Sequence, residues 1–287
     1  MPLVTTKEML KKAQAEGYAV GAFNANNLEI IQAIIEVAEE ERAPVILQAS
    51  QGAIKYAGLE YIVAMVKTAA EKATIPVALH LDHGTDYLQN IKCLRAGFTS
   101  LMFDGSKLPF DENVALTKKV CEMAHAVDIP VEAEIGQIGK AGGDEPGVAI
   151  EKAHEFYAKP EEAQRFVELT GLDSLAAAVG TIHGCRTPFA KLDIPRIEKI
   201  RELTKVPLVL HGASGCNDEE IKKGIAAGMS KINIDTRIRM AFVKKTREVL
   251  AEKPDEIDPR KILGPAKEAV KEVIRDRMRH FGCNKKA

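Results

Sequence analysis

The chain has 287 residues, of which 46% are hydrophobic and 28% charged, and its formal net charge is −1. This near-neutral balance argues against a nucleic-acid partner held by bulk charge, and no apolar run approaches the ~18 residues of a membrane span. The five cysteines form no CxxC pair and the first ten residues lack the apolar core of a signal peptide, so a reduced protein of the cytoplasm is expected.

Eight short apolar segments alternate with longer helical patterns along the chain. The segments are rich in Val, Ile, Leu and Ala with little polar alternation, which is typical of strands buried on both faces of a parallel sheet. In chain order they lie at 19–24, 44–50, 76–83, 100–105, 130–136, 174–180, 207–212 and 231–236. Between them apolar residues recur at helical spacing, as at Leu28, Ile31 and Ile35.

Eight strand–helix units in series predict an α/β fold, a (β/α)8 TIM barrel formed by residues 1–287 as a single domain. A helix at 259–281 follows the eighth unit and is an extra C-terminal element. The alternative is a doubly wound open sheet, which shows the same alternation. The connection at 137–160 is long, rich in glycine and charged, and we expect it to be a mobile loop over the active site.

Histidines and acids fall just past the ends of several predicted strands, where TIM barrels carry their active sites. His83, His183 and His211 follow three different strands. A lone histidine in such a place is more often structural, but three converging imidazoles are a recurrent ligand set for a zinc ion with an open position. Asp104 and Glu134 end two further strands, and each either binds the metal or orients a metal-bound imidazole.

The remaining histidines are interpreted as non-ligands. By the alternation of its strand, His80 is expected to face away from the strand-end side chains. Three others lie in helix or loop contexts: His125, His154 and His280. Glu132 alternates with Glu134, so it is expected to face the same side of its strand and to hydrogen-bond within the barrel.

The segment HGASGCNDEE, at 211–220, places small residues just before a predicted helix. Gly212, Ser214 and Gly215 let backbone N–H groups approach an anion, and a helix N-terminus favours negative charge. The next strand ends in NIDT at 233–236, also before a helix, and Gly184 follows His183. Phosphate sites are frequent after strands 7 and 8 of such barrels, although glycines also form ordinary turns, so a phosphate site beside the metal is expected.

Across essentially its whole length the sequence resembles the class II, zinc-dependent fructose-bisphosphate/tagatose-bisphosphate aldolase family. The matching stretches are GAFNANNLE, HLDHG, GFTSLMFDGSKLPFDENVALTK, VEAEIGQIG, AVGTIHG, PLVLHGASG, SKINIDT and DPRKILGPAKEAVKEVI. The resemblance implies an aldehyde-lyase of glycolysis and carbohydrate metabolism. It would reversibly cleave a ketose 1,6-bisphosphate to dihydroxyacetone phosphate and glyceraldehyde 3-phosphate through a zinc-stabilised enediolate.

The resemblance also implies roles for single residues. The zinc ligands correspond to His83, His183 and His211, and the acids near the metal to Glu134 and Asp104. Asp82 corresponds to the acid/base at the C4 hydroxyl, and Glu145 to the loop glutamate that handles the dihydroxyacetone phosphate proton. The cradle of the C1 phosphate corresponds to Gly184, Gly212, Ser214, Asn233 and Thr236. Contacts to the distal phosphate correspond to Ser50 and Arg237, with Arg260 reaching the site of a neighbouring subunit.

Family members are homodimers or homotetramers, so the resemblance implies a homo-oligomer. Backbone groups around Gly184 and Gly212 would hold a monovalent cation, Na⁺ or K⁺, beside the zinc. The sequence leaves open whether the oligomer is a dimer or a tetramer.

Two features of the sequence bear on the identity of the substrate. After Gly184 the run Cys185-Arg186-Thr187 stands where many fructose-bisphosphate aldolases carry an aromatic residue and then a lysine. Asp235 favours fructose-type stereochemistry at C4, because tagatose-type enzymes commonly have an alanine there. Fructose 1,6-bisphosphate is therefore expected, with tagatose bisphosphate or another phosphorylated ketose as the alternative.

Two other classes of protein stay open at this point. A metal-dependent barrel hydrolase would use the open zinc position to activate water, and it would need no phosphate cradle on strands 7 and 8. A sugar-phosphate-binding protein without activity would not need Asp82 beside three histidines.

Overall fold

The computed structural model describes residues 3–140, 153–187 and 190–287 of the chain. Eight parallel strands lie side by side in the order β3-β2-β1-β10-β9-β7-β5-β4. Two isolated parallel bridges, His80 to Ser100 and Gly84 to Phe103, join the β3 edge to the β4 edge. The predicted (β/α)8 barrel is therefore confirmed, and the open doubly wound sheet is wrong.

The strands are short and buried on both faces, as their apolar sequences predict. Their bounds are β1 Val20–Asn24, β2 Val45–Ser50, β3 Val77–Asp82, β4 Leu101–Phe103, β5 Val131–Ile135, β7 Ser174–Ala177, β9 Leu208–Leu210 and β10 Met229–Ile234. A proline, which cannot donate to a ladder, stands directly before four of them: Pro44, Pro76, Pro130 and Pro207.

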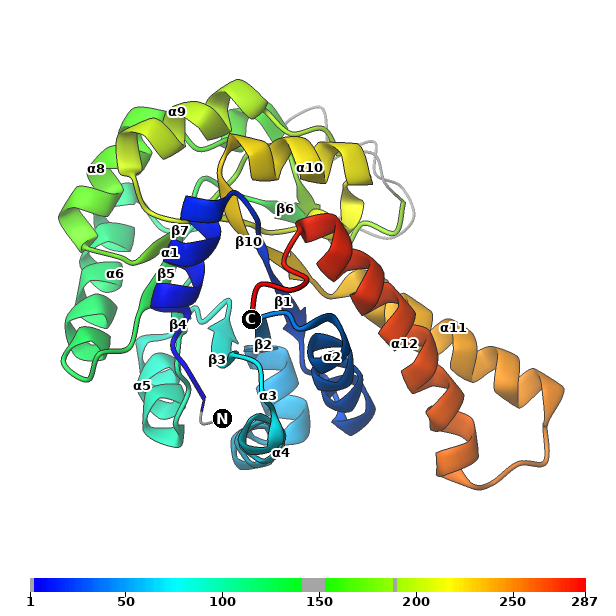
Figure 1. Cartoon of the computed structure of the whole chain (residues 1–287). Coiled ribbons are helices and arrows are strands. Elements are labelled where there is room, and N and C mark those ends of the chain that lie inside the picture. Colours follow the sequence, from blue (N-terminus) through cyan, green and yellow to red (C-terminus); the bar gives the residue numbers. More distant parts are fainter. Residues whose placement is uncertain (1–2, 141–152, 188–189) are drawn as a thin grey trace.

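Helices surround the barrel (Figure 1). They are α1 Thr6–Glu16, α2 Leu28–Glu41, α3 Gln51–Ala57, α4 Leu59–Lys72, α5 Tyr87–Ala96, α6 Phe110–His125, α8 Pro160–Thr170, α9 Ile194–Thr204, α10 Asp218–Ala227, α11 Thr236–Glu252 and α12 Pro259–Phe281, with short 3₁₀ helices η1 Ala153–Phe156 and η2 Ala213–Gly215. Helix α1 is tied to the start of β3 and to the barrel interior, because the amide of Val4 donates to Val77 O and Thr6 Oγ1 donates to Ser100 Oγ. None of the helices described is long and apolar enough to cross a membrane.

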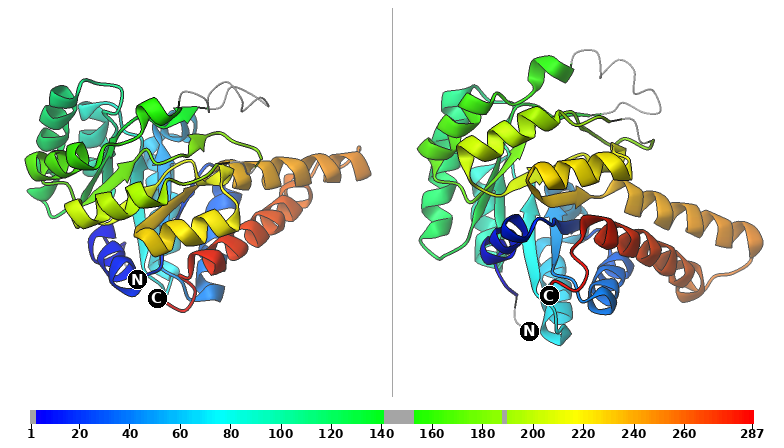
Figure 2. Two further views of the ribbon diagram at one scale, coloured as in Figure 1. Left: turned by 90° about the horizontal axis from the view of Figure 1, so that it is seen from above. Right: turned by 45° about the horizontal axis from the view of Figure 1, so that its top comes forward.

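Helices α11 and α12 form a hairpin that projects from the barrel (Figures 1 and 2). The extra helix starts at Pro259 and ends at Phe281. Its C-terminal half packs on the barrel side through Val270, Ile274 and Met278, all buried, whereas its first residues lie at the tip of the hairpin. The tip of the hairpin therefore lies away from the barrel.

A small second sheet was not predicted. The strand β6, Gly139–Lys140, pairs in parallel with β8, Ile182–His183. Strands of two residues carry no readable pattern, because period-two alternation needs about four or more residues to show. The pairing ties the first residues of the 137–160 connection to His183, while its residues 141–152 lie outside the described part of the chain.

Gly84→Ala is expected to destabilise the fold, because this glycine lies where the ends of β3 and β4 meet. A Cβ there would lie 2.6 Å from Leu81 Cδ2, 2.6 Å from the Met102 carbonyl oxygen and 2.9 Å from Asn90 Nδ2. Overpacking of this kind costs about 1–3 kcal/mol. Urea unfolding monitored by circular dichroism measures the loss.

Gly52→Ala is the matched control. Gly52 lies in α3, and the nearest atom to its added Cβ is Ser50 Oγ at 3.8 Å, an ordinary contact. This variant should unfold at the wild-type urea concentration or slightly above it. Equal stability of the two variants would show that the ends of β3 and β4 are less closely packed than described.

Candidate active site

Asp82 is the last residue of β3 and a buried carboxylate at the open end of the barrel. Its Oδ2 accepts a hydrogen bond from Asn24 Nδ2 (3.0 Å), and its Oδ1 accepts one from Asn233 Nδ2 (3.3 Å). Burial alone would raise the pKa of Asp82, but the imidazoles of His83 and His211 hold that pKa below its usual range. Asp82 is therefore an ionised, oriented carboxylate that can accept a proton.

His83 follows directly, with a left-handed backbone (φ +50°), which is uncommon outside glycine and frequent at functional sites. Its Nδ1 hydrogen-bonds to Asp104 Oδ2 at 2.7 Å. The other oxygen of Asp104 accepts from the amide (3.1 Å) and hydroxyl (2.7 Å) of Ser106. Burial alone would raise the pKa of Asp104, but these hydrogen bonds hold it well below its usual range. Both oxygens of Asp104 are engaged, so this carboxylate orients the imidazole of His83. The Nε2 of His83 stays available to another ligand.

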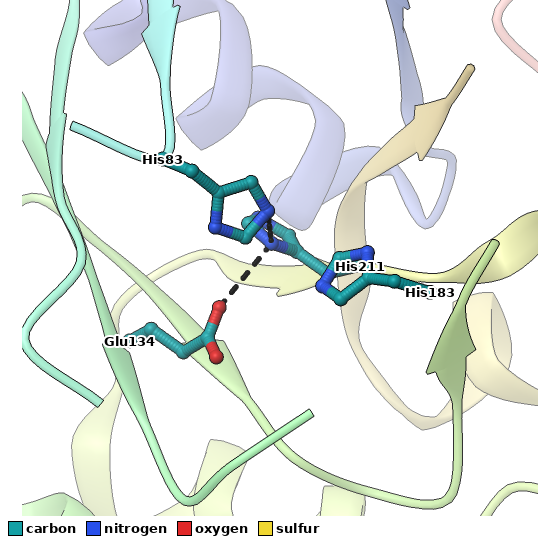
Figure 3. A group of neighbouring side chains, drawn as sticks. All are labelled: His83, Glu134, His183 and His211. Atoms are coloured by element: carbon teal, nitrogen blue, oxygen red, sulfur yellow. Dashed lines mark hydrogen bonds and ion pairs between the residues drawn. The ribbon is translucent and has the colours of Figure 1, made fainter. Parts of the chain in front are cut away.

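Four side chains from different strand ends converge beside Asp82 (Figure 3). His83, Glu134, His183 and His211 each offer one ligand atom, and these atoms lie within 4.8 Å of one another. His83 Nε2 and His211 Nδ1 are 3.2 Å apart, and Glu134 Oε2 lies 3.3 Å from the same Nδ1. Imidazole nitrogens and a carboxylate facing a common point are the donor set of a transition-metal site.

Two atoms of this group point to a missing partner. Within the described residues, His183 Nε2 is buried and has no hydrogen-bond partner, and the buried Glu134 Oε2 makes no hydrogen bond apart from its ion pair with His211 Nδ1 at 3.3 Å. Buried polar atoms of this kind nearly always have one, so each such exception needs an explanation. A cation bound by all four side chains would satisfy both atoms, and the residues present therefore fit a metal.

His211 is the most deeply buried of the three histidines, with no exposed surface. Its Nε2 hydrogen-bonds to Glu132 Oε1 at 2.9 Å, as expected for a glutamate turned into the barrel. Burial alone would lower the pKa of His211, but the contacts with Glu132 and Glu134 raise it to about 10. Burial and the neighbouring imidazoles lower the pKa of His183 to about 3. Adjacent imidazoles with such different pKa values are typical of functional sites.

A cavity of about 650 Å³ opens over this group. Its lining includes Asp82, His83, Asp104, Glu134 and His183, whereas His211 is fully buried. The structure also places in its wall most residues predicted to bind substrate or phosphate: Ser50, Gly184, Gly212, Ser214, Asn233, Asp235 and Thr236. Three of the four residues of the metal group and the predicted phosphate cradle therefore share one cavity.

The predicted phosphate cradle is formed by backbone that passes close to β8. Gly212 has a left-handed backbone (φ +66°), and a Cβ there would lie 3.0 Å from the carbonyl group of Ile182. Only glycine fits this approach, which brings Ser214 to the cavity. Thr236 begins α11, so the positive end of that helix adds to the attraction for an anion.

Arg239 lies in the cavity wall and was not predicted. Its guanidinium contacts Asp235 Oδ2 at 2.6 Å, and Asn26 Nδ2 donates to Asp235 Oδ1 at 3.1 Å. Burial raises the pKa of Asp235, and Arg239 opposes that rise. The signal in the sequence is the i,i+4 spacing of Asp235 and Arg239 at the start of a helix.

Two predicted residues within the described part of the chain do not line the cavity. Arg237 donates to the backbone carbonyls of Ser214 (3.2 Å) and Cys216 (2.7 Å), so its guanidinium supports the η2 turn. Arg260 pairs with Asp258 at the start of α12, where its side chain is 89% exposed. Glu145 lies outside the described residues.

The placement of His80 corrects the sequence interpretation. His80 does not face away from the site: it lies in the barrel interior, on the same face of β3 as Asp82, with Nδ1 2.8 Å from Ser100 Oγ. The other three histidines set aside as non-ligands are not members of the metal group, and they contact Asp173, Tyr157 and Asp218 in turn: His125, His154 and His280. Arg186, in the stretch that departs from the family pattern, is exposed and outside the cavity wall.

Comparison with known proteins agrees with this geometry. The family model described as fructose-bisphosphate aldolase class-II matches residues 4–286. The chain is 50% identical to a probable fructose-bisphosphate aldolase of Bacillus subtilis (strain 168) over 100% of both chains, and 48% identical to the fructose-bisphosphate aldolase of Thermus caldophilus over 98% of both. Among solved structures, the YdjI aldolase from Escherichia coli K12 matches with a TM-score of 0.87 and 34% identity over 99% of both chains.

Proposed function

The chain belongs to the class II fructose-bisphosphate aldolase family, a family of metal-dependent lyases that act on sugar phosphates, and we propose the details of its reaction as follows. It reversibly cleaves fructose 1,6-bisphosphate to dihydroxyacetone phosphate and glyceraldehyde 3-phosphate. The metal is zinc, held by His83, His183 and His211, with Glu134 beside them.

One observation carries this proposal. Three members of the metal-type donor group (His83, Glu134 and His183), the ionised carboxylate of Asp82 and a glycine-containing turn at Gly212 that suits an anion line a single cavity at the open end of the barrel. An aldolase needs all three at once, because it must stabilise charge, move a proton and hold a phosphate. A barrel hydrolase needs no anion site there, and a non-catalytic binding protein needs no oriented carboxylate.

The chemistry divides between the metal and the protein. A bound zinc ion supplies Lewis-acid stabilisation of the negative charge that develops on the ketose oxygens. In cleavage, Asp82 accepts the proton of the C4 hydroxyl, and that O–H electron pair forms the aldehyde carbonyl as the C3–C4 bond breaks. Asn24 and Asn233 support this role by fixing both carboxylate oxygens of Asp82.

The electron pair of the broken bond stays on the dihydroxyacetone phosphate half until C3 takes up a proton. The family resemblance assigns that proton to Glu145, which lies outside the described residues. In synthesis the same steps run backwards, and Asp82 returns its proton to the new C4 oxygen.

The substrate phosphates bind at two places in the cavity. Gly184, Gly212 and Ser214, with Thr236 at the positive end of α11, take the phosphate of the dihydroxyacetone half, which positions C3 and C4 beside Asp82. Ser50 contacts the distal phosphate. Because Arg237 is engaged by backbone carbonyls, Arg239 is the better candidate for the cationic side chain of this cavity.

The proposal also covers the oligomeric state of the chain, a monovalent cation and the cellular compartment. The chain forms a homodimer or homotetramer in which Arg260 reaches the site of a neighbouring subunit. Arg260 is exposed near the start of α12, and this end of the helix lies at the tip of the projecting hairpin (Figure 2). Backbone groups around Gly184 and Gly212 hold a monovalent cation, Na⁺ or K⁺. All five cysteines are unpaired and buried, which supports a reducing compartment such as the cytoplasm.

The chain is expected to prefer fructose 1,6-bisphosphate over tagatose 1,6-bisphosphate by more than about tenfold in kcat/KM. The two sugars differ only in the orientation of the C4 hydroxyl, and mispairing one buried hydrogen-bonding group costs about 1–3 kcal/mol. Asp235, oriented by Asn26 and Arg239, is assigned to this discrimination. Coupled spectrophotometric assays with both substrates measure the preference.

Asp235→Ala should reduce the preference while zinc content stays at the wild-type level. Glu252→Ala, at the far end of the same helix, should leave it unchanged. Preference for tagatose bisphosphate in the wild type would overturn the substrate assignment but not the family. Cleavage of neither sugar with zinc bound would point to another phosphorylated ketose.

A further inference from the structure

Below the cavity floor, the barrel interior contains a second layer of polar side chains. Inward-facing residues of a barrel lie two apart on each strand and stack in layers. Asp82 and Asn233 line the cavity, and the residues two positions before them are His80 and Lys231. Glu132 stands in the same relation to Glu134. The three lower residues are almost completely buried.

These three side chains form a continuous chain of hydrogen bonds that ends at a proposed metal ligand. Lys231 Nζ donates to Glu132 Oε2 at 2.7 Å and to His80 Nε2 at 3.2 Å. Glu132 Oε1 in turn accepts from His211 Nε2 at 2.9 Å. His80 Nδ1 contacts Ser100 Oγ, to which Thr6 Oγ1 of α1 also donates.

The contact with Glu132 determines which nitrogen of His211 is available. A carboxylate that accepts from Nε2 keeps a proton on that nitrogen, so Nδ1 is the nitrogen that faces the site and would bind a metal. His211 Nδ1 is the nitrogen that lies 3.2 Å from His83 Nε2 and 3.3 Å from Glu134 Oε2. Glu132 therefore selects the ligating nitrogen, and Lys231 fixes Glu132 by holding its second oxygen.

We infer that the buried Lys231–Glu132 ion pair is a positioning device for the metal, which sets metal affinity by orienting His211. The inference rests on the proposed function, since it assumes that His211 is a metal ligand. Lys231 and Glu132 touch neither substrate nor metal and act only through the imidazole.

Simple filling of the core does not explain this pair. The interior of such barrels is ordinarily packed with branched apolar side chains, and two buried charges cost several kcal/mol each in lost solvation. Replacing a buried ion pair by neutral groups of similar volume is often neutral or stabilising. A pair kept only for stability would therefore be dispensable, whereas a pair that orients His211 would not.

The double variant Glu132→Gln/Lys231→Met separates these two roles. It removes both charges while keeping the approximate volumes, so it avoids the unpaired buried charge that Lys231→Met alone would leave. The zinc affinity of the whole chain is measured by competition with a chromophoric chelator, and urea unfolding of the metal-free protein is measured beside it. Substitution with Co²⁺ adds an absorption spectrum that reports the ligand geometry.

The double variant should unfold like the wild type without metal, yet bind zinc about 10–100-fold more weakly and show a changed Co²⁺ spectrum. Lys271→Met removes a lysine that pairs with Glu36 and Glu40 on the outer helices, and it should leave zinc affinity unchanged. Wild-type zinc affinity and spectrum in the folded double variant would overturn the inference. Zinc binding without aldol cleavage in the wild type would refute the proposed function and leave the inference standing. A wild type that binds no zinc would refute both.

Discussion

Asp82→Asn is expected to lower kcat for cleavage of fructose 1,6-bisphosphate by about 10²–10⁴-fold, the usual contribution of a positioned acid/base. The amide has nearly the shape of the carboxylate, so the side-chain oxygen can still accept from Asn24. It cannot accept the C4 hydroxyl proton. Because Asp82 is not a member of the metal group, zinc content should stay at the wild-type level.

Asp86→Asn provides the matched control, because it makes the same change four residues along the chain. Asp86 is the exposed N-cap of α5, where its carboxylate accepts from Leu88 N, and asparagine caps helices equally well. Its kcat should equal that of the wild type. If Asp82→Asn also turned over at the wild-type rate, Asp82 would not be the acid/base.

His211→Ala is expected to lower zinc content and cleavage together. Four-ligand zinc sites bind with about 10–16 kcal/mol, so the loss of one ligand should weaken binding on the order of 10²–10³-fold. The variant also removes the partner of Glu132 Oε1, leaving part of a buried carboxylate unsatisfied. Elemental analysis of the purified protein measures zinc per chain, and the coupled assay measures cleavage.

His125→Ala tests whether the effect is specific. His125 lies at the end of α6, where its Nε2 contacts Asp173, and it should keep full zinc content and turnover when replaced. Full zinc occupancy in His211→Ala would rule out His211 as a ligand. Loss of zinc in both variants would indicate general destabilisation in place of a ligand role.

The barrel and the position of the site at its open end were predictable because buried strands have apolar sequences. Strands buried on both faces are mostly apolar, so polar residues at the C-terminal end of a run mark the open end of the barrel, as at Asp82 and His211. The three histidines and the glycine-rich turn at Gly212 follow from the same logic. Their common cavity needs only the parallel topology, which the alternation of strands and helices already predicts.

The orientations of some side chains depend on tertiary packing and could not be predicted from a local sequence pattern. His80 was expected to face away from the strand-end side chains, but β3 ends at Asp82, and His83 lies past the strand with a left-handed backbone. Counted from Asp82, two residues away, His80 faces the barrel interior. Arg237 and Arg239 both lie in the first turns of α11, and only the packing of that helix against η2 determines that Arg239 reaches the cavity.

The most direct test of the proposed function is the cleavage of fructose 1,6-bisphosphate by the same protein sample before dialysis against EDTA, after it, and after zinc is restored, with zinc content measured at each stage. The convergence of His83, Glu134, His183 and His211 predicts cleavage that disappears with the metal and returns with it. Cleavage that persists in protein free of metal would contradict the metal-dependent mechanism, and absence of cleavage in fully loaded protein would contradict the substrate.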